Sequence, residues 1–410
     1  MSTRPLRFVH ASDLHLEMPP YGLAEVPEHL RELVIECPYW AAERVFAVAL
    51  AEEAEFLVLS GDVLQPQQTG PRGPLFLAEQ FERLGERGIR VYWAGGLVDP
   101  PEAWPTCVRL PENVHVFSSQ RVERCLHQRD GLPLASIVGT SRHEGQEIAL
   151  GDFSAAPDGL FTVAVLHASA EADALRSRGI DYWAVGGNHV RQSLYGEPQA
   201  AHYPGIAQGR EPTQIGPHGC TLAQVDAERR IRITLVAADV LRFFSERIAL
   251  DPAMSRKDLQ TRLHDRIDAL RQSNPGVDVF VAWTIVGDGP LMAELRRGSL
   301  AASLLETIRS EHGFGSPAVW SLALAAEPPA VLPASWYDQQ TILGDFLREL
   351  RERQADPERP LLLESYLSEG HRSGPLAAAA AIVPGPARER ISRDAAMLGC
   401  DLLSGEEPMP

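Results

Sequence analysis

RFVHASDLHL, residues 7–16, is the stretch that decides the fold. Its first half is a largely apolar run typical of a buried strand, and Asp13 and His15 follow at once. The same order recurs downstream in FLVLSGD (56–62), TVAVLH (162–167) and YWAVGGNH (182–189). Near-continuous apolar runs predict strands that are buried on both faces. With a strand at 91–94 and a helix at 41–54, they predict an α/β domain over residues 1–240.

The polar residues at the ends of these runs are candidate metal ligands: Asp13, His15, Asp62, His167 and His189. In open α/β sheets, ligands bind outside the carboxyl ends of the strands, so these side chains should meet at one edge. One His or one Gly-Asp after a strand is most often structural, but the ordered set is much harder to explain in that way. Carboxylate with imidazole suits manganese first, and iron or zinc as alternatives.

The motifs resemble those of the calcineurin-like metallophosphoesterases. More narrowly, FVHASDLHL, LVLSGDVL, DYWAVGGNHVRQ and HYPGIAQGR are similar to the SbcD/YhaO-type DNA repair exonucleases. The resemblance covers the first 240 residues with several motifs in order. It implies an α/β fold: a metallophosphoesterase-type β-sandwich flanked by helices, then a small α+β capping domain and a helical C-terminal tail. It also implies a manganese-dependent hydrolase that acts on DNA.

The resemblance implies a site for two metals. The first metal takes four residues that this chain retains: Asp13, His15, Asp62 and His189. The second metal shares Asp62 and takes His167, which is a remnant of that half. Its two other ligand positions are Leu97 and Gly187, which offer no ligand atom. We therefore expect at most one tightly held divalent metal.

WAGGLVDP, residues 93–100, is where the chain departs from the family pattern Gly-Asn-His-Asp. The family's His assists at the scissile phosphate, but here it is Val98, which cannot donate a hydrogen bond. Asn188 should point away from the second metal, and Asn113 and His115 lie in a different strand. His143 is the least implausible substitute. No catalytic residue is assigned with confidence.

Three hypotheses remain open. The first is a degenerate subunit of a DNA double-strand-break repair nuclease that keeps one metal and serves in DNA binding or assembly. The second is an active phosphodiesterase or exonuclease that uses one metal or an unusual second site. The third is an interaction module whose polar residues only hold loops. Losing one donor aimed at developing charge typically costs about 100- to 1000-fold in rate, which places the first hypothesis ahead.

The composition limits the compartment and the partners. The chain has 410 residues and a net charge of −17, so nucleic-acid contact needs a local basic groove. Its five scattered cysteines lack C-x-x-C spacing, which favours reduced thiols in a cytoplasmic protein. The longest purely apolar run, 376–383, is too short to span a bilayer. No membrane partner is expected.

The remainder predicts two smaller regions. Residues 241–327 should form the capping domain, with a helix opened by a Ser255–Asp258 capping box and a strand at 279–287. Residues 328–410 should be helical after a linker at 327–333, with helices at 336–353 and 386–404 around a break at 368–375. An apolar stripe on the first of these helices either packs on its own domain or docks a partner: Ile342, Leu343, Phe346, Leu347 and Leu350. By resemblance the partners are an SMC-like coiled-coil ATPase and DNA, with a homodimer as a further assembly.

Overall fold

The computed structural model describes residues 5–142, 145, 148–296, 298–327, 332, 334–355, 361–363, 367, 372, 380–382 and 385–403. The chain divides into two compact units. The first contains Met1–Ser245, Arg271–Val281 and Gly315–Leu322. The second contains Glu246–Leu270, Ala282–Phe314 and Ala323–Pro410. The three-domain division expected from the sequence stays a prediction.

The first unit contains two six-stranded mixed sheets. One has the order β12-β11-β1-β2-β3-β4, with bounds β1 Leu6–Ala11, β2 Phe56–Leu59, β3 Arg90–Trp93, β4 Val114–Val116, β11 Gly219–Val225 and β12 Ile231–Ala237. The other has the order β5-β6-β7-β8-β10-β9, with bounds β5 Glu123–Arg129, β6 Leu132–Gly139, β7 Phe161–His167, β8 Tyr182–Gly186, β9 Gln192–Tyr195 and β10 Ala200–Tyr203. β1 to β4 run parallel, as do β6, β7 and β8.

The two sheets pack face to face, and the alternation of side chains along β1 shows how. Phe8 lies between the sheets, where its ring stacks on Phe56 at 4.9 Å and meets the edge of Tyr182 at 5.0 Å. The next residue, Val9, belongs to the core between its sheet and the helices. Because successive strand residues point to opposite faces, both faces of β1 are apolar. The predicted helix-flanked β-sandwich is confirmed.

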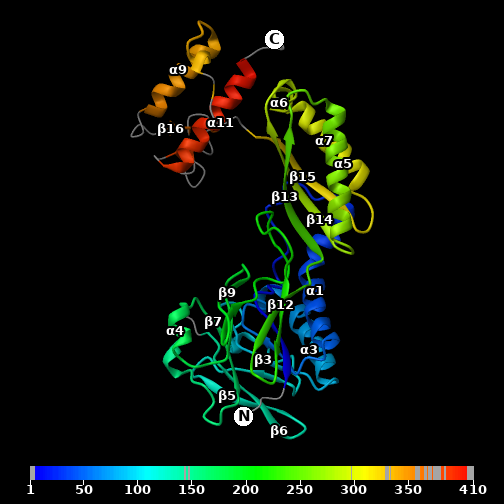
Figure 1. Cartoon of the computed structure of the whole chain (residues 1–410), viewed down its shortest axis with the longest axis vertical. Helices are drawn as coiled ribbons and strands as arrows, with labels where there is room; N and C mark the ends of the chain where they lie inside the picture. The colour runs from blue at the N-terminus through cyan, green and yellow to red at the C-terminus, as the bar shows by residue number, and fades with distance from the viewer. Residues whose placement is uncertain are drawn as a thin grey trace. The chain divides into compact units, whose positions relative to one another are not determined.

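Helices cover the outer face of each sheet (Figure 1). α1 (Glu28–Ala51) and α3 (Arg72–Gly85) lie on one side, and α4 (Ala172–Arg176) lies on the other. Short helical turns complete the connections: α2 (Pro66–Thr69), η1 (Pro101–Ala103) and η2 (Leu150–Asp152).

Helix α1 begins at Glu28, well before the predicted start at residue 41. Pro38 inside it has no N–H for the carbonyl of Val34, and the Cys37 thiol donates to that carbonyl instead, at 3.5 Å. The early turns bury apolar side chains against Phe243 and Phe280. Packing therefore overrides the local signal of the proline.

A three-stranded sheet has the order β13-β14-β15. Its strands are β13 (Leu241–Leu250), β14 (Asp278–Gly287) and β15 (Val319–Ala326), and its helices are α5 (Arg256–Ser273), α6 (Pro290–Arg296) and α7 (Ser299–His312). The predicted capping box is confirmed, because the Ser255 N–H donates to Asp258 at 2.9 Å and the Asp258 N–H donates to Ser255 Oγ at 3.3 Å. The expected face of α5 is buried: Leu259, Leu263, Ile267 and Leu270.

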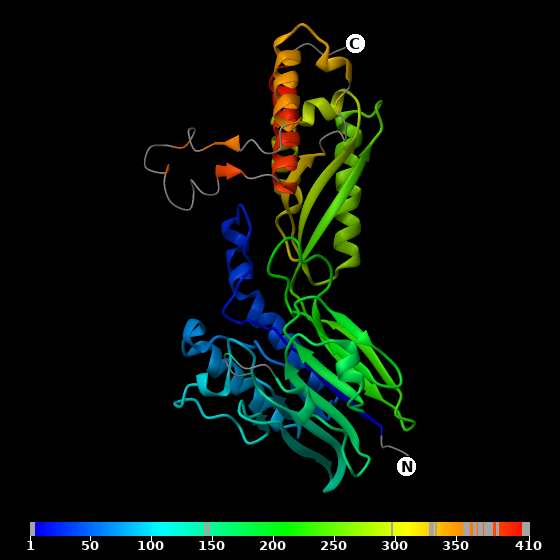
Figure 2. The same cartoon turned by 90° about the vertical axis from the view of Figure 1, so that its left-hand side faces the viewer.

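The C-terminal region contains α8 (Ala334–Tyr337), α9 (Ile342–Ala355), α11 (Pro386–Leu403), β16 (Leu361–Leu362) and β17 (Ala381–Ile382). The single helix predicted over 336–353 is thus two helices. α9 and α11 lie side by side (Figure 2), and Leu347 is fully buried between them. At Gly399 an added Cβ would overlap the Phe346 ring, so a larger residue there would require that ring to move. The linker residues 328–331 and 333, and the break except Arg372, lie outside the described residues.

None of the helices within the described ranges is long and apolar enough to cross a membrane.

Candidate metal centre

Four strand ends bring the predicted residues together. Asp13 and His15 follow β1, and Asp62 follows the neighbouring strand β2. His167 ends β7, and His189 follows the neighbouring strand β8. Their ligand atoms form two groups in which all atoms lie within 4.8 Å of one another: Asp13, His15 and His189, and Asp13, Asp62 and His167. The predicted clustering is confirmed, and the role of these residues as ligands stays a prediction.

The backbone at this cluster is strained. Asp13, His15 and Asp62 have φ angles of 53°, 43° and 52°, in the left-handed region that side chains rarely adopt. Each such residue costs about 1–3 kcal/mol and persists only when its surroundings fix it. Hydrogen bonds between the two loops do so here, since the Asp13 N–H donates to Gly61 O at 2.9 Å and the His15 N–H to Asp62 O at 3.1 Å. Such strain is concentrated at functional sites.

The side chains of Asp13 and His15 each present one free atom to the cluster. Asp13 Oδ2 accepts from Ser12 Oγ at 2.5 Å and from the Gly187 N–H at 3.1 Å, whereas Oδ1 is buried and has no hydrogen-bond partner in the described chain. His15 Nδ1 lies 3.0 Å from Glu17 Oε1, and its Nε2 is likewise buried and unpartnered. An oriented imidazole with a carboxylate behind it is typical of a metal ligand. These residues therefore fit a divalent metal.

Glu17 is suited to hold His15 in that orientation. Burial opposes its ionisation, but the hydrogen bonds from His15 and from the Gln65 N–H prevail and lower the pKa of Glu17. An ionised Glu17 accepts a hydrogen bond from the His15 Nδ1–H, so the lone pair of His15 lies on Nε2.

Asp62 and His167 are the two residues that the family resemblance predicted for the second metal. Asp62 Oδ2 lies 3.4 Å from His167 Nε2 and 3.9 Å from His15 Nε2. His167 Nδ1 lies 2.9 Å from Ser60 O, which can only accept, so Nδ1 is the donor and Nε2 faces Asp62. One carboxylate oxygen is thus placed between the two halves.

Leu97 and Gly187, the two positions at which the sequence predicted a missing ligand, present no polar side chain. Leu97 directs its side chain to solvent and is 56% exposed. Gly187 has a φ of 96°, and an added Cβ would lie 3.1 Å from His167 Nε2. Asn188 is half-buried, and its Nδ2 donates to Gln192 Oε1 at 3.1 Å. His143 lies outside the described residues, and no other described residue joins either ligand group.

Asp99, which sequence reasoning did not single out, holds the loop after β3. Both its oxygens accept two bonds: Oδ1 from the Asp62 and Gly96 N–H groups at 2.8 and 2.6 Å, and Oδ2 from the Val63 N–H and Trp93 Nε1 at 3.0 Å. Burial and the Asp62 charge raise the pKa of Asp99 to about 7, against the effect of these donors. It keeps the last position of the family motif, which is the signal that could have revealed it.

The comparisons with known proteins identify the family. No protein-family model matches the chain. The chain is 31% identical over 339 residues to "Uncharacterized metallophosphoesterase YhaO" of Bacillus subtilis (strain 168). The aligned region covers 78% of this chain and 82% of that protein. The chain belongs to the metallophosphoesterase family.

Solved structures of lower similarity add no further argument. A dimetal phosphatase from Danio rerio aligns with this metallophosphoesterase at a TM-score of 0.34 and 9% identity, over 56% of this chain and 98% of its own. Vacuolar Protein Sorting 29 from Cryptosporidium parvum aligns at 0.23 and 16% identity, over 56% and 96%. The assignment therefore rests on the Bacillus relative.

Metallophosphoesterases use divalent metals, and in this member Asp13, His15 and His189 would hold one. The predicted fourth ligand, Asp62, groups with Asp13 and His167 instead. When bound, such an ion lowers the pKa of its water and polarises a phosphoryl oxygen. For that ion the protein supplies buried carboxylates, the oriented His15 side chain and the backbone hydrogen bonds that fix the loops after β1 and β2.

Arg210, in the motif HYPGIAQGR, is a second residue that sequence reasoning missed. It is 3% exposed, and its Nη2 lies 3.1 Å from both ring nitrogens of His189. Its Nη1 donates to Met18 Sδ at 3.0 Å. Burial, then the Arg210 charge, lower the pKa of His189. An arginine in a loop looks like a surface residue until the fold places it beside the cluster.

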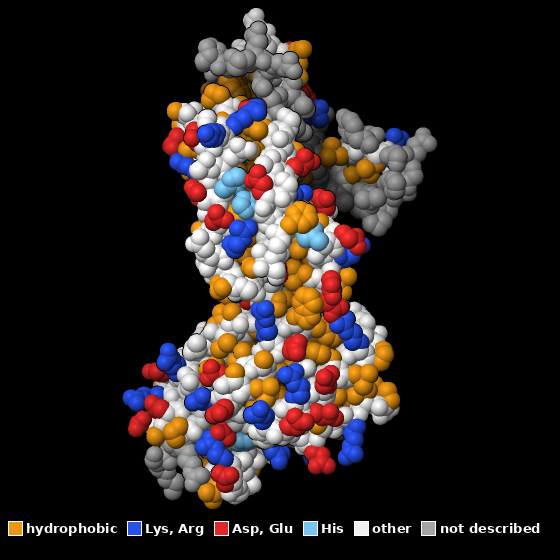
Figure 3. Space-filling view, turned by 90° about the vertical axis from the view of Figure 1, so that its right-hand side faces the viewer, with side chains coloured by type: hydrophobic (Ala, Val, Ile, Leu, Met, Phe, Trp, Pro, Cys, Tyr) orange, Lys and Arg blue, Asp and Glu red, His pale blue; other side chains and the backbone are white. Residues whose placement is uncertain are grey.

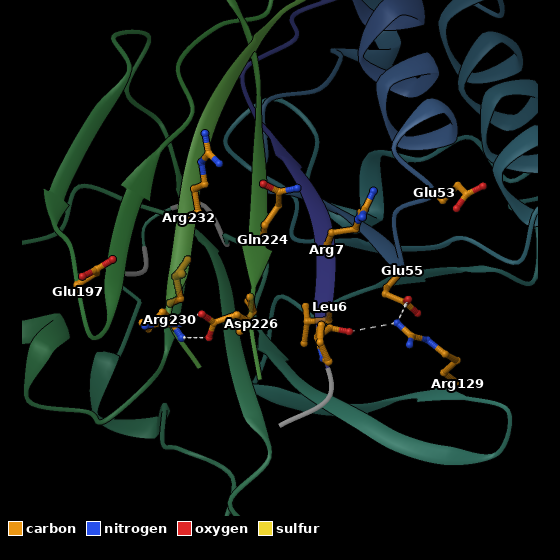
Figure 4. A pocket seen from close by; sticks show the side chains of 13 residues that line it. Leu6, Arg7, Glu53, Glu55, Arg129, Glu197, Gln224, Asp226, Arg230 and Arg232 are labelled. Carbon is orange, nitrogen blue, oxygen red and sulfur yellow. Dashed lines mark hydrogen bonds and ion pairs between the residues drawn. The ribbon is translucent and has the colours of Figure 1, made fainter. Parts of the chain in front are cut away.

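A cavity of about 620 Å³ elsewhere in this metallophosphoesterase is not part of the site (Figure 4). It lies at the opposite ends of the strands, around Leu6 and Ile231. Its arginines meet carboxylates, as Arg129 does with Glu55 and Arg230 does with Asp226. Because the charges are balanced, this cavity offers no particular attraction to a phosphate.

Proposed function

We propose that this metallophosphoesterase is a DNA-binding or assembly subunit of a repair nuclease complex, with one divalent metal and weak or no hydrolytic activity. One observation carries the proposal: the first half of the metal edge presents unpartnered ligand atoms, and the second half presents Leu97, Val98 and Gly187. Two-metal hydrolysis clamps the attacking and leaving oxygens together. Without the second ion and the family His, that clamp is incomplete.

The retained half supports binding rather than turnover. Asp13 Oδ1 and His15 Nε2 are buried without partners among the described residues, which is unfavourable unless a cation satisfies them. Manganese suits this mixture of carboxylate and imidazole. Removal of a general acid or base typically costs about 100- to 10,000-fold in rate. A site that keeps its metal but has Val98 in place of the family His therefore binds better than it hydrolyses.

An active one-metal phosphodiesterase is the second candidate. It is favoured by Asp62 Oδ2, which lies within 4 Å of both His15 and His167 and stands ready to hold a metal between them. The two candidates predict the same metal content and differ in turnover.

DNA and an SMC-like ATPase are the proposed partners. The surface drawn in Figure 3 intersperses acidic and basic side chains, so a DNA contact on that face would need a local arrangement rather than a broad basic patch. On α9, Leu343 and Leu347 are buried against α11, whereas Ile342 is 75% exposed. The exposed edge of α9 at Ile342 is the proposed docking point for the ATPase.

The test measures metal content and turnover on the same full-length protein. We expect one manganese per chain at the cluster and little release of p-nitrophenol from bis(p-nitrophenyl) phosphate. A second trio of possible ligands, His264, Glu311 and His312, could add metal to the count, so the His264→Gln variant is measured in parallel. Two ions per chain in that variant, or rapid turnover, would contradict the proposal.

A further inference from the structure

Arg210 is a buried cation that makes no direct ion pair within the described residues, and the carboxylates of Asp13, Glu17 and Glu211 act on it only from beyond ion-pair distance. Its Nε is buried and has no hydrogen-bond partner, and none of the ion pairs within the described ranges involves it. Burying an ion costs several kcal/mol unless a partner of opposite charge compensates. A buried charge without a direct partner is a candidate for a ligand-binding or other functional residue.

Arg242, in the same unit, shows what a structural buried arginine looks like. Its guanidinium donates to both oxygens of Asp239, at 2.6 and 2.7 Å, and to Asn274 Oδ1 at 2.6 Å. All three residues are buried. The two arginines therefore have similar burial and opposite degrees of compensation.

The position of Arg210 points to the open side of the metal edge. Its backbone is fixed, because its N–H donates to Gln214 Oε1 at 2.7 Å and its carbonyl accepts from the Tyr21 N–H at 2.8 Å. Its guanidinium contacts His189, whose side chain is 42% exposed, and the sulfur of half-buried Met18. Met18 is flexible and is a weak acceptor, so an incoming anion can replace it at Nη1.

We infer that Arg210 binds a phosphate group at this site and supplies the positive charge that the lost second metal no longer provides. This inference rests on the proposed function, since it requires a phosphate ester to enter the metal edge. A guanidinium presents its N–H donors in a fork that matches two phosphate oxygens. Arg210 has an unpartnered Nε–H and a weakly engaged Nη1 for this purpose, beside a residue of the first metal half.

A purely structural role for Arg210 predicts different behaviour. If Arg210 served only to pack on His189, its removal would destabilise the fold and leave anion binding unchanged. If it binds phosphate, its removal relieves an uncompensated buried charge and abolishes the anion effect. A structural role therefore predicts lower stability with unchanged anion binding. A phosphate-binding role predicts no loss of stability with anion binding abolished.

The experiment compares the full-length wild type with Arg210→Gln, Arg210→Lys and the matched control Arg242→Gln. Melting temperature is measured on metal-free protein with increasing inorganic phosphate. We expect saturating phosphate to raise the wild-type Tm by about 2–4 °C. Arg210→Gln should lose this shift and should melt no lower than wild type in phosphate-free buffer. Arg210→Lys should keep part of the shift, and Arg242→Gln should melt lower yet keep it.

Titration calorimetry with the same probe should show phosphate affinity at least about 10-fold weaker in Arg210→Gln. An unchanged phosphate shift in Arg210→Gln, or no shift in wild type, overturns the inference. Manganese binding is measured on every variant to separate the two proposals. Wild type that binds manganese but shows no Arg210-dependent phosphate effect refutes only this inference. Wild type that binds no metal refutes the proposed function.

Discussion

The loops after β1 and β3 leave the same sheet at the same edge, but one presents side-chain ligand atoms and the other only a fixed backbone. The β1 loop turns Asp13 and His15 inward with unpartnered ligand atoms. The β3 loop keeps its backbone frame, since the Leu97 and Val98 N–H groups both donate to Asp62 Oδ1, at 2.7 and 3.1 Å. Its side chains, however, carry no ligand. Backbone hydrogen bonds can therefore fix the conformation of a loop whose side chains offer no metal ligand.

The largest expected effect comes from the β1 loop. Asp13→Asn keeps a residue type that tolerates positive φ but removes a charged ligand. Losing a residue behind a ligand typically costs about 10- to 100-fold in metal affinity, so losing a charged ligand itself should cost more than about 100-fold. Manganese titration by calorimetry measures it. Unchanged affinity would mean that the metal lies elsewhere.

The next effect tests the frame of the β3 loop. Asp99→Asn leaves some of the four N–H donors around Asp99 without an acceptor, and should lower the free energy of unfolding by about 2–4 kcal/mol. Asp158→Asn is the matched control, because that carboxylate accepts a bond from Leu160 N–H at 3.2 Å and is exposed. Urea unfolding of both variants is the measurement. Equal stability of the two would show that Asp99 does not hold the loop.

A smaller effect is expected behind the first ligands. Glu17→Gln weakens the orientation of His15 and should reduce manganese affinity about 10- to 100-fold. The exposed Glu79 in α3 provides the control variant, Glu79→Gln, which should bind as wild type does. Competition with a chelating dye resolves the difference. Identical affinities would place His15 outside the metal site.

The smallest effect on stability is expected at Leu97, one of the two positions where a missing ligand is predicted. The Leu97 N–H donates to Asp62 Oδ1, whereas the Leu97 side chain is exposed. Leu97→Asn should therefore change the free energy of unfolding by no more than about 0.5 kcal/mol. Gly187→His differs, because the positive φ and the nearby His167 should cost about 1–3 kcal/mol. Thermal unfolding of the two single variants compares them. A stable Gly187→His variant would show that the loop relaxes freely.

The strands and the metal cluster could be predicted because each signal is local. An apolar run followed at once by Asp or His identifies a strand end, and parallel strands bring such ends together. The start of α1 could not be predicted, because Pro38 signals a break and only packing against Phe243 and Phe280 outweighs it.

Other features depend on the tertiary fold. β5, with the sequence ERCLHQR, has too few apolar residues to stand out as a strand, and its pairing with β6 fixes it. The missing ligands at Leu97 and Gly187 were predicted through the family resemblance, and they stay a prediction. The uncompensated charge of Arg210 was not predicted, because only the folded chain excludes water from it.

The pairing of β1 has a consequence for synthesis of the protein. β1 joins β2 on one side soon after both have been made, but on its other side Leu6 pairs with Val225. During translation, that side of β1 stays an open sheet edge until β11 leaves the ribosome. Open edges template association between chains. Newly made chains should therefore depend on chaperones until this late pairing closes the sheet, and fragments that end before Gly219 should aggregate.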